Sequence, residues 1–219
     1  MLRYLLLSLL LMPWFAAPAL PGAWPRAKGT AFVATSAQIE GPDEHGVYRQ
    51  NVTLFAEYGL TERLTLGVDV GGDAVRTSKT VAFLRWPVGP AERPLKLAVE
   101  LGGGQVQGET ALRPGLNIGR GIKLWERYGW LAVDSRAVLV EGGGTSLEGE
   151  ATFGLSVTAR SRVILQLQVG APDEGRDYTR FAPSFVYQIR PGAHIEAGLI
   201  EPLTGAGHRG FKLGLWRSF

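Results

Sequence analysis

Large apolar side chains take every second position in Leu95-Lys96-Leu97-Ala98-Val99-Glu100-Leu101. Successive side chains of a β-strand point to opposite faces, so this period of two predicts a strand with one apolar face. The same period recurs along the chain, and turn residues separate its repeats. Twelve strands are expected, at about residues 30–39, 48–58, 63–72, 79–86, 94–103, 110–119, 129–140, 146–158, 162–170, 178–188, 194–200 and 210–219. The helical period is nearly absent, and only residues 121–127 have room for one helical turn.

Composition narrows the classes of protein and of site. The chain has 219 residues, which predicts a single domain, and its 30 Gly fit a fold with many turns and close backbone contacts. It contains no Cys, which excludes disulfides, Cys-ligated metal centres and a thiol nucleophile. The net charge is only +3, without a Lys/Arg cluster, so a nucleic-acid partner is not expected.

The first residues have the layout of a secretory signal peptide. Arg3 precedes a short apolar run at residues 5–12, and small residues follow at Ala17, Ala19 and Ala23. The apolar run is too short for a spanning helix. We therefore expect a signal peptide over residues 1–23, cleaved after Ala19 or Ala23, an exported protein, and a β-domain over residues 24–219.

Two architectures share this alternation, a closed membrane barrel and a soluble β-sandwich. The apolar phase is almost free of charge, which favours contact with lipid. Twelve strands of about 9–11 residues fit the length of the chain, and an even strand number returns both ends to one side. Only a closed sheet pairs every backbone group within lipid. Aromatic residues near strand ends predict interfacial girdles, at Tyr48, Tyr58, Trp86, Trp130, Tyr187 and Phe219. The expected fold is a single antiparallel transmembrane barrel.

The other phase of the strands is expected to line the lumen, with equal numbers of both charges. The cations are Arg49, Arg85, Lys96, Arg113, Arg136, Arg180 and Lys212. The anions are Glu57, Asp69, Glu100, Asp134, Glu148, Glu150 and Glu196. Balanced charge predicts ion pairs across the lumen and weak selectivity. A twelve-stranded barrel lies between filled 8-stranded and open 16-stranded ones. These features predict a narrow passive channel for small polar solutes.

The last nine residues, Phe-Lys-Leu-Gly-Leu-Trp-Arg-Ser-Phe, carry a resemblance. The segment resembles the C-terminal signature of bacterial outer-membrane β-barrel proteins, which implies that the barrel-assembly machinery recognises Phe211, Leu213, Leu215 and Phe219. It also implies an outer-membrane location, with outer-membrane lipids as partners. The hairpin at residues 56–61 and the strand at residues 181–184 resemble small channel-type barrels grouped with the phenol meta-pathway outer-membrane proteins.

Three residues depart from the barrel pattern. Pro114 and Pro183 fall within expected strands, where proline removes a ladder donor, so we expect bulges or shifted strand boundaries there. Arg217 falls in the lipid-facing phase, close enough to the chain end to reach the interface.

Other functions remain open at this point. For an outer-membrane lipid-modifying enzyme, the candidate catalytic residues would be His45 or His208, near Asp43, Glu44 or Ser146. A structural barrel without transport and a soluble lipocalin-like binder also fit the alternation. No metal or cofactor site is visible, because no cluster of ligands or phosphate-binding loop before a helix occurs.

Overall fold

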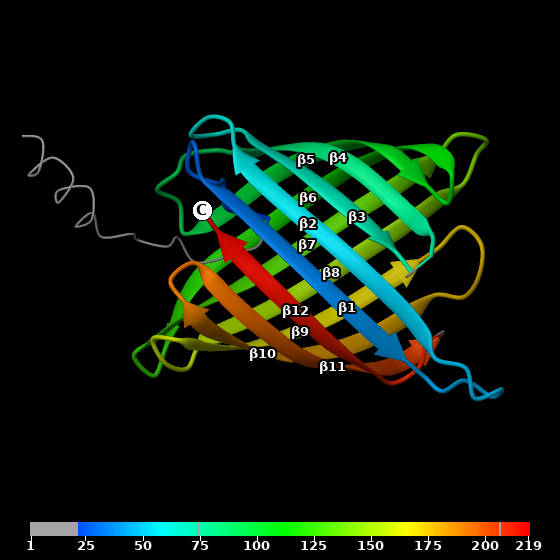
Figure 1. Cartoon of the computed structure of the whole chain (residues 1–219). Helices are drawn as coiled ribbons and strands as arrows, with labels where there is room; N and C mark the ends of the chain where they lie inside the picture. Colours follow the sequence, from blue (N-terminus) through cyan, green and yellow to red (C-terminus); the bar gives the residue numbers. More distant parts are fainter. Residues whose placement is uncertain (1–21, 74, 206) are drawn as a thin grey trace, which may run out of the picture.

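The computed structural model describes residues 22–73, 75–205 and 207–219, and the described part is a closed antiparallel barrel (Figure 1). Its strands are β1 (Ala31–Glu40), β2 (Arg49–Gly59), β3 (Thr65–Gly72), β4 (Thr77–Val88), β5 (Leu95–Val106), β6 (Glu109–Leu124), β7 (Arg127–Val140), β8 (Thr145–Ser156), β9 (Ser161–Ala171), β10 (Tyr178–Arg190), β11 (Ala193–Gly205) and β12 (Gly210–Ser218). The twelve-stranded barrel expected from the sequence is confirmed. Most of the expected signal peptide, including the Ala19 cleavage point, lies outside the described residues.

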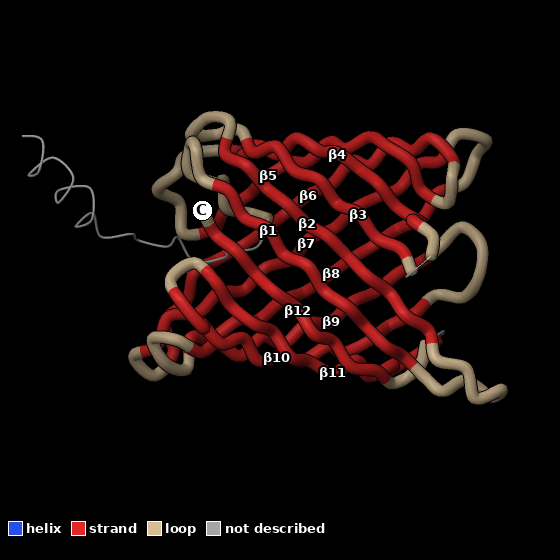
Figure 2. Tube along the Cα trace, viewed as in Figure 1, coloured by secondary structure: helices blue, strands red, loops and turns tan. Residues whose placement is uncertain are grey.

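Each strand pairs with its neighbours in the sequence, and β1 closes the barrel against β12. Closure runs from Phe32 opposite Ser218 to Glu40 opposite Gly210, and Phe219 continues it by donating its N–H to the carbonyl of Ala31 at 2.9 Å. Figure 2 shows that consecutive strands lie side by side around the barrel and that loops join them at its two ends. We call the end that bears the start of β1 and Phe219 the terminal end, and the opposite end the distal end.

Exposure follows the period of two. In β4, Val81, Phe83 and Arg85 are buried in the lumen, whereas Leu84 and Trp86 are about two-fifths exposed on the outside. The other strands repeat this pattern, so the outer surface of the barrel is covered with large apolar side chains. A surface of this extent requires an apolar environment or a partner. The described residues contain no helix long and apolar enough to span a membrane.

Aromatic side chains form a girdle at the terminal end. Tyr58, Trp86, Tyr187 and Phe219 are exposed there near strand ends, as expected, and Tyr48 is exposed at the distal end. The expectation for Trp130 is wrong, because this side chain is 4% exposed and lies inside the barrel. Its even position in β7 matches that of the buried Ala132, so the alternation itself places it on the inner face.

The two prolines lie within strands that continue on both sides of them. Pro114 pairs in register with β5, while the ladder toward β7 omits it and resumes at Gly115 with the register intact. Pro183 pairs in register with β9, while the ladder toward β11 omits it and resumes at Ser184 with the register intact. Each proline therefore interrupts one of its two ladders, because a strand residue directs its N–H toward only one neighbour. The bulges expected at these positions are absent; register shifts in β10 occur at Thr179/Arg180 and Gln188/Arg190.

The segment with room for a helical turn forms a hairpin instead. β6 and β7 extend to Leu124 and Arg127, and only Trp125 and Glu126 connect them. Both connecting residues have positive φ values of 46° and 62°. This left-handed pair suits the right-handed twist of a two-residue hairpin, which explains why the strand pairing continues to the turn.

Candidate functional site in the barrel lumen

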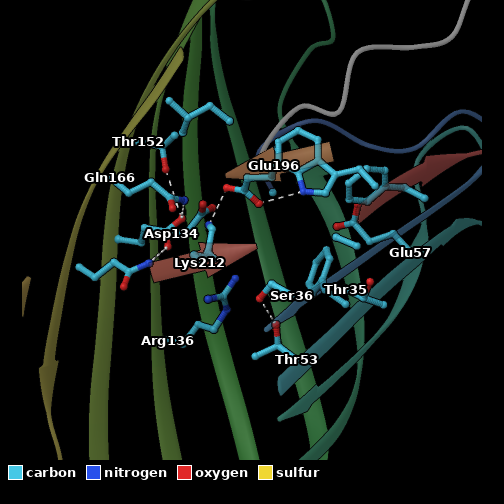
Figure 3. Close-up of a pocket in the computed structure, with 18 of the residues that line it drawn as sticks. Thr35, Ser36, Thr53, Glu57, Asp134, Arg136, Thr152, Gln166, Glu196 and Lys212 are labelled. Atoms are coloured by element: carbon cyan, nitrogen blue, oxygen red, sulfur yellow. Dashed lines mark hydrogen bonds and ion pairs between the residues drawn. The ribbon is translucent and has the colours of Figure 1, made fainter. Parts of the chain in front are cut away.

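The lumen contains a polar cavity of about 320 Å³ (Figure 3). Hydroxyl groups, amides, charged groups and two tryptophans line it, from strands on all sides of the barrel. Among the lining residues are Thr35, Ser36, Thr53, Glu57, Arg85, Trp130, Asp134, Arg136, Glu150, Thr152, Gln166, Gln168, Glu196, Lys212 and Trp216.

One wall of the lumen, formed by β2 to β7, carries a connected network of buried ions. Glu100 is its centre, because Arg85 contacts its Oε2 at 2.7 Å, Arg113 its Oε1 at 3.1 Å and Arg136 its Oε1 at 3.5 Å. Glu100 is 3% exposed and Arg113 fully buried. Three guanidinium groups thus share one carboxylate, which fixes all of them against the wall.

Two further carboxylates complete this network. Arg85 also contacts Glu57, and Arg113 contacts Asp69 at 2.5 Å. Phe83 lies beneath both guanidinium groups, with their central carbons 4.9 and 5.5 Å from its ring centroid. Cation–π contacts of this kind add to the ion pairs. The network therefore holds its side chains along the wall and leaves the adjoining space open.

The wall formed by β8 and β9 is mostly neutral. Glu150 accepts hydrogen bonds from Gln166 at 2.8 Å, Gln168 at 2.9 Å and Thr152 at 3.2 Å. Its neighbour in the ladder, Asp134 on β7, is 6% exposed. These two carboxylates and the amides face the cavity from the side opposite β1 and β2.

Further ion pairs lie between these walls. Glu196 makes an ion pair with the ammonium group of Lys212 at 2.6 Å, and it accepts a hydrogen bond from the indole N–H of Trp216 at 3.1 Å. Arg180 reaches Glu40 at 3.3 Å. Pairs across the lumen were expected, but the ion pairs between described strands join strands no more than three places apart in the barrel. The side chains are too short to cross the full diameter, so the pairs follow the wall.

Arg49, Lys96 and Glu148, which were also expected in the lumen, make no ion pair with the Glu100 network among the described residues. Arg49 is exposed at the distal rim, opposite Glu40 in the ladder. Lys96 is at the terminal end, where its ammonium donates to the carbonyl of Ala91. Glu148 is partly buried and faces Arg136 across the β7–β8 ladder.

Three further charged residues that were not expected in the lumen make ion pairs there. Lys79 contacts Asp69 at 2.9 Å, and its position in β4 has the parity of Arg85, so the alternation does place it inside. Glu40 ends β1 one residue beyond the expected boundary. Arg26 precedes the first strand, and no periodic signal marks its place in the lumen; its Nε donates to Glu57 at 2.6 Å.

Arg26 belongs to an N-terminal strap, residues 22–30, that enters the lumen from the terminal end. Its backbone N–H donates to Thr65 Oγ1 at 3.0 Å, and Ala23 is fully buried. Trp24 packs against a cluster of Trp130, Ala132, Ile164 and Val186, together with Trp216. The apolar side chains of the strap and the cluster therefore narrow the terminal half of the lumen, where part of the cluster borders the polar cavity.

Gly119 on β6 leaves room for the strap, because the Trp24 ring packs directly against its backbone. A Cβ at Gly119 would lie 2.4 Å from a ring carbon of Trp24 and 2.8 Å from the Cβ of Ala23. We expect Gly119→Ala to displace the strap, to raise single-channel conductance and to shift tryptophan emission to the red. Gly121→Ala is the matched control, since a Cβ there meets nothing within 4 Å. A red shift in emission without a rise in conductance would show that the strap does not limit the passage, and unchanged emission would contradict the contact between Trp24 and Gly119.

The C-terminal residues expected to carry the assembly signal lie on the outer face. Phe211, Leu213 and Leu215 are 58–69% exposed on β12, and Phe219 follows the strand. Arg217 lies beside Phe219, with its guanidinium 5.3 Å from the ring centroid.

Asp43, His45 and Ser146, which were considered for an enzyme, have structural contacts. Asp43 Oδ1 accepts the N–H groups of Val47 at 3.0 Å and His45 at 2.9 Å, and these hydrogen bonds lower the pKa of its carboxyl group. Ser146 accepts the N–H of Asp173 at 3.1 Å. In the described ranges, no three His, Cys, Asp or Glu side chains are close enough to hold a metal ion.

The sequence matches no protein-family model and no curated protein. Among solved structures, the chain is similar to the KdgM porin, with 11% identity and a TM-score of 0.63 over 85% of this chain and 99% of that one. The same porin in complex with disordered oligogalacturonate gives the same values. An outer membrane channel from Pseudomonas putida has 15% identity and a TM-score of 0.56 over 92% of this chain and 100% of that one. The chain therefore has the fold of bacterial outer-membrane channel barrels.

Proposed function

We propose that the protein is a bacterial outer-membrane barrel that forms a narrow passive channel for small polar solutes. The observation that carries this proposal is the polar cavity inside the closed barrel. Its ion pairs run along the wall between nearby strands, so they line a passage and do not bridge it. A barrel that served only as a scaffold would gain more stability from a filled, apolar interior.

The outer surface supports the membrane location. Large apolar side chains project from the strands all around the barrel, and an aromatic girdle lies at the terminal end. Closed barrels satisfy every backbone group internally, which lipid demands. Export through a signal peptide and assembly through the C-terminal strand belong to the same proposal.

The arrangement of charge favours small solutes that are neutral or carry few charges. Arg26, Arg85, Arg136 and Lys212 are the cations that line the cavity, and each contacts a carboxylate of the barrel. Removing them from those carboxylates would leave buried charges unpaired. A polyanion such as the oligogalacturonate in the KdgM structure is therefore not expected to bind in this lumen.

Single-channel recording in planar bilayers tests the proposal. The refolded full chain is expected to produce discrete conductance steps, smaller than those of 16-stranded porins because a barrel's diameter grows with strand number. Heat-modifiable migration in detergent gels shows independently that the barrel is folded. A folded barrel that never conducts would contradict the channel and leave the structural barrel as the better account.

A further inference from the structure

The β7–β8 ladder places two carboxylates directly opposite each other inside the barrel. Asp134 pairs in register with Glu150, and both line the polar cavity. Like charges at opposite positions of an antiparallel pair destabilise it unless a cation lies near. The arrangement calls for a positive group on the cavity side.

Asp134 lines the cavity and has one buried acceptor without a partner in the described part of the chain. Asp134 is only 6% exposed, and its Oδ1 has no hydrogen-bond partner among the described residues. Asn117, opposite Asp134 on β6, is fully buried, and its Oδ1 also lacks a partner within that part of the chain. A Cβ at Gly22 would lie 2.7 Å from Asn117 Oδ1, 3.0 Å from Asp134 Oδ1 and 3.0 Å from the guanidinium carbon of Arg85. The two oxygens thus meet at Gly22 of the strap, beside the Arg85 guanidinium and at the border of the cavity.

Glu150 offers a second site of negative charge. Its hydrogen-bond donors, Gln166, Gln168 and Thr152, are all neutral, so they orient the carboxylate without cancelling its charge. Figure 3 shows Asp134, Thr152 and Gln166 grouped on one side of the cavity.

The cations that line the cavity contact other carboxylates. Arg26 and Arg85 contact Glu57, and Arg136 contacts Glu100. Lys212, on the opposite side, contacts Glu196. These four cations reduce the negative electrostatic potential at Asp134 and Glu150, but none of them makes an ion pair with either carboxylate within 4 Å.

We propose that Asp134 and Glu150 form a binding site for the ammonium group of a small cationic solute, and that this site makes the channel prefer cations. The proposal rests on the channel function proposed above. An ammonium group supplies several N–H donors, which suit the carboxylates of Asp134 and Glu150 that line the cavity. Trp130 lines the same cavity and offers apolar surface to the carbon atoms of an organic cation.

The test combines reversal potentials with a binding measurement that needs no conductance. In a KCl gradient across a planar bilayer, the native chain is expected to pass K⁺ more readily than Cl⁻. The double variant Asp134→Asn with Glu150→Gln is expected to lower this permeability ratio by about 3- to 10-fold, because two fixed negative charges are removed at close range. Glu148→Gln removes the same charge from β8, opposite Arg136, and is expected to change the ratio much less.

Calorimetric titration of the full chain in detergent micelles with methylammonium chloride gives the second readout. Binding to the native chain that is lost in the double variant supports the site, even if the barrel fails to conduct. A conducting barrel whose selectivity is the same in the double variant would overturn the site and leave the channel intact. Binding that appears only after residues up to Arg26 are removed would assign the pair to the chain's own N-terminal segment and would also overturn the solute site.

Discussion

Replacing Glu100 with glutamine is expected to lower the free energy of unfolding by about 3–5 kcal/mol, the usual cost of breaking a buried ion pair by removing one partner. Glu100 is the carboxylate that Arg85, Arg113 and Arg136 share. Glutamine keeps its size and one acceptor oxygen, but it removes a charge that three guanidinium groups contact. Arg85 and Arg113 keep Glu57 and Asp69, whereas Arg136 loses its ion pair with Glu100. The expected loss therefore comes from excess positive charge within a buried wall.

Urea titration of the barrel folded in lipid vesicles measures this loss. Glu126→Gln is the matched control, because Glu126 makes an ion pair with Lys123 at 2.5 Å, but its side chain is 88% exposed. An exposed pair of this kind contributes little to stability. If both variants unfolded at the native urea concentration, the buried network would have no structural role.

Replacing Leu116 with arginine is expected to destabilise the folded barrel by about 2–4 kcal/mol, the cost of an arginine on the lipid face near the bilayer midplane. Leu116 is in the middle of β6 and is 44% exposed on the outer surface. In a soluble protein the same exposed position would tolerate arginine. The prediction therefore separates a lipid-facing surface from a water-facing one.

Val75→Arg is the control for this second prediction. Val75 is in the loop between β3 and β4 and is 97% exposed, so water surrounds the new charge. Equilibrium unfolding in vesicles is expected to show a loss for Leu116→Arg only. Equal stability of the two variants would contradict lipid contact at Leu116.

The alternation of side chains predicted most of the fold because a period of two fixes both the strands and their faces. It identified every strand and placed Glu57, Arg85, Glu100 and Arg113 within the lumen. The same rule, applied consistently, would also have placed Trp130 and Lys79 inside. These two errors came from incomplete use of the signal, not from its absence.

Other features of the site lay beyond the reach of the alternation. The strap has no periodic pattern, so its entry into the lumen depends on tertiary contacts such as that of Arg26 with Glu57. Arg113 and Asp69 come from β6 and β3, and their contact depends on how the closed sheet curves. The pairing of Asp134 with Glu150 required the exact register of β7 and β8, which strand boundaries alone do not give.

The orientation of the two faces is tested most directly by spin labels along β7. The chain has no Cys, so single cysteines can be introduced at the outward Leu131, Val133 and Leu139 and at the inward Ala132 and Val138. In lipid vesicles, collision with oxygen, which concentrates in acyl chains, is expected to be high at the three outward sites and low at the two inward ones. Outward sites that collided more with a water-soluble nickel complex than with oxygen would show that this surface faces water, and would contradict the membrane barrel.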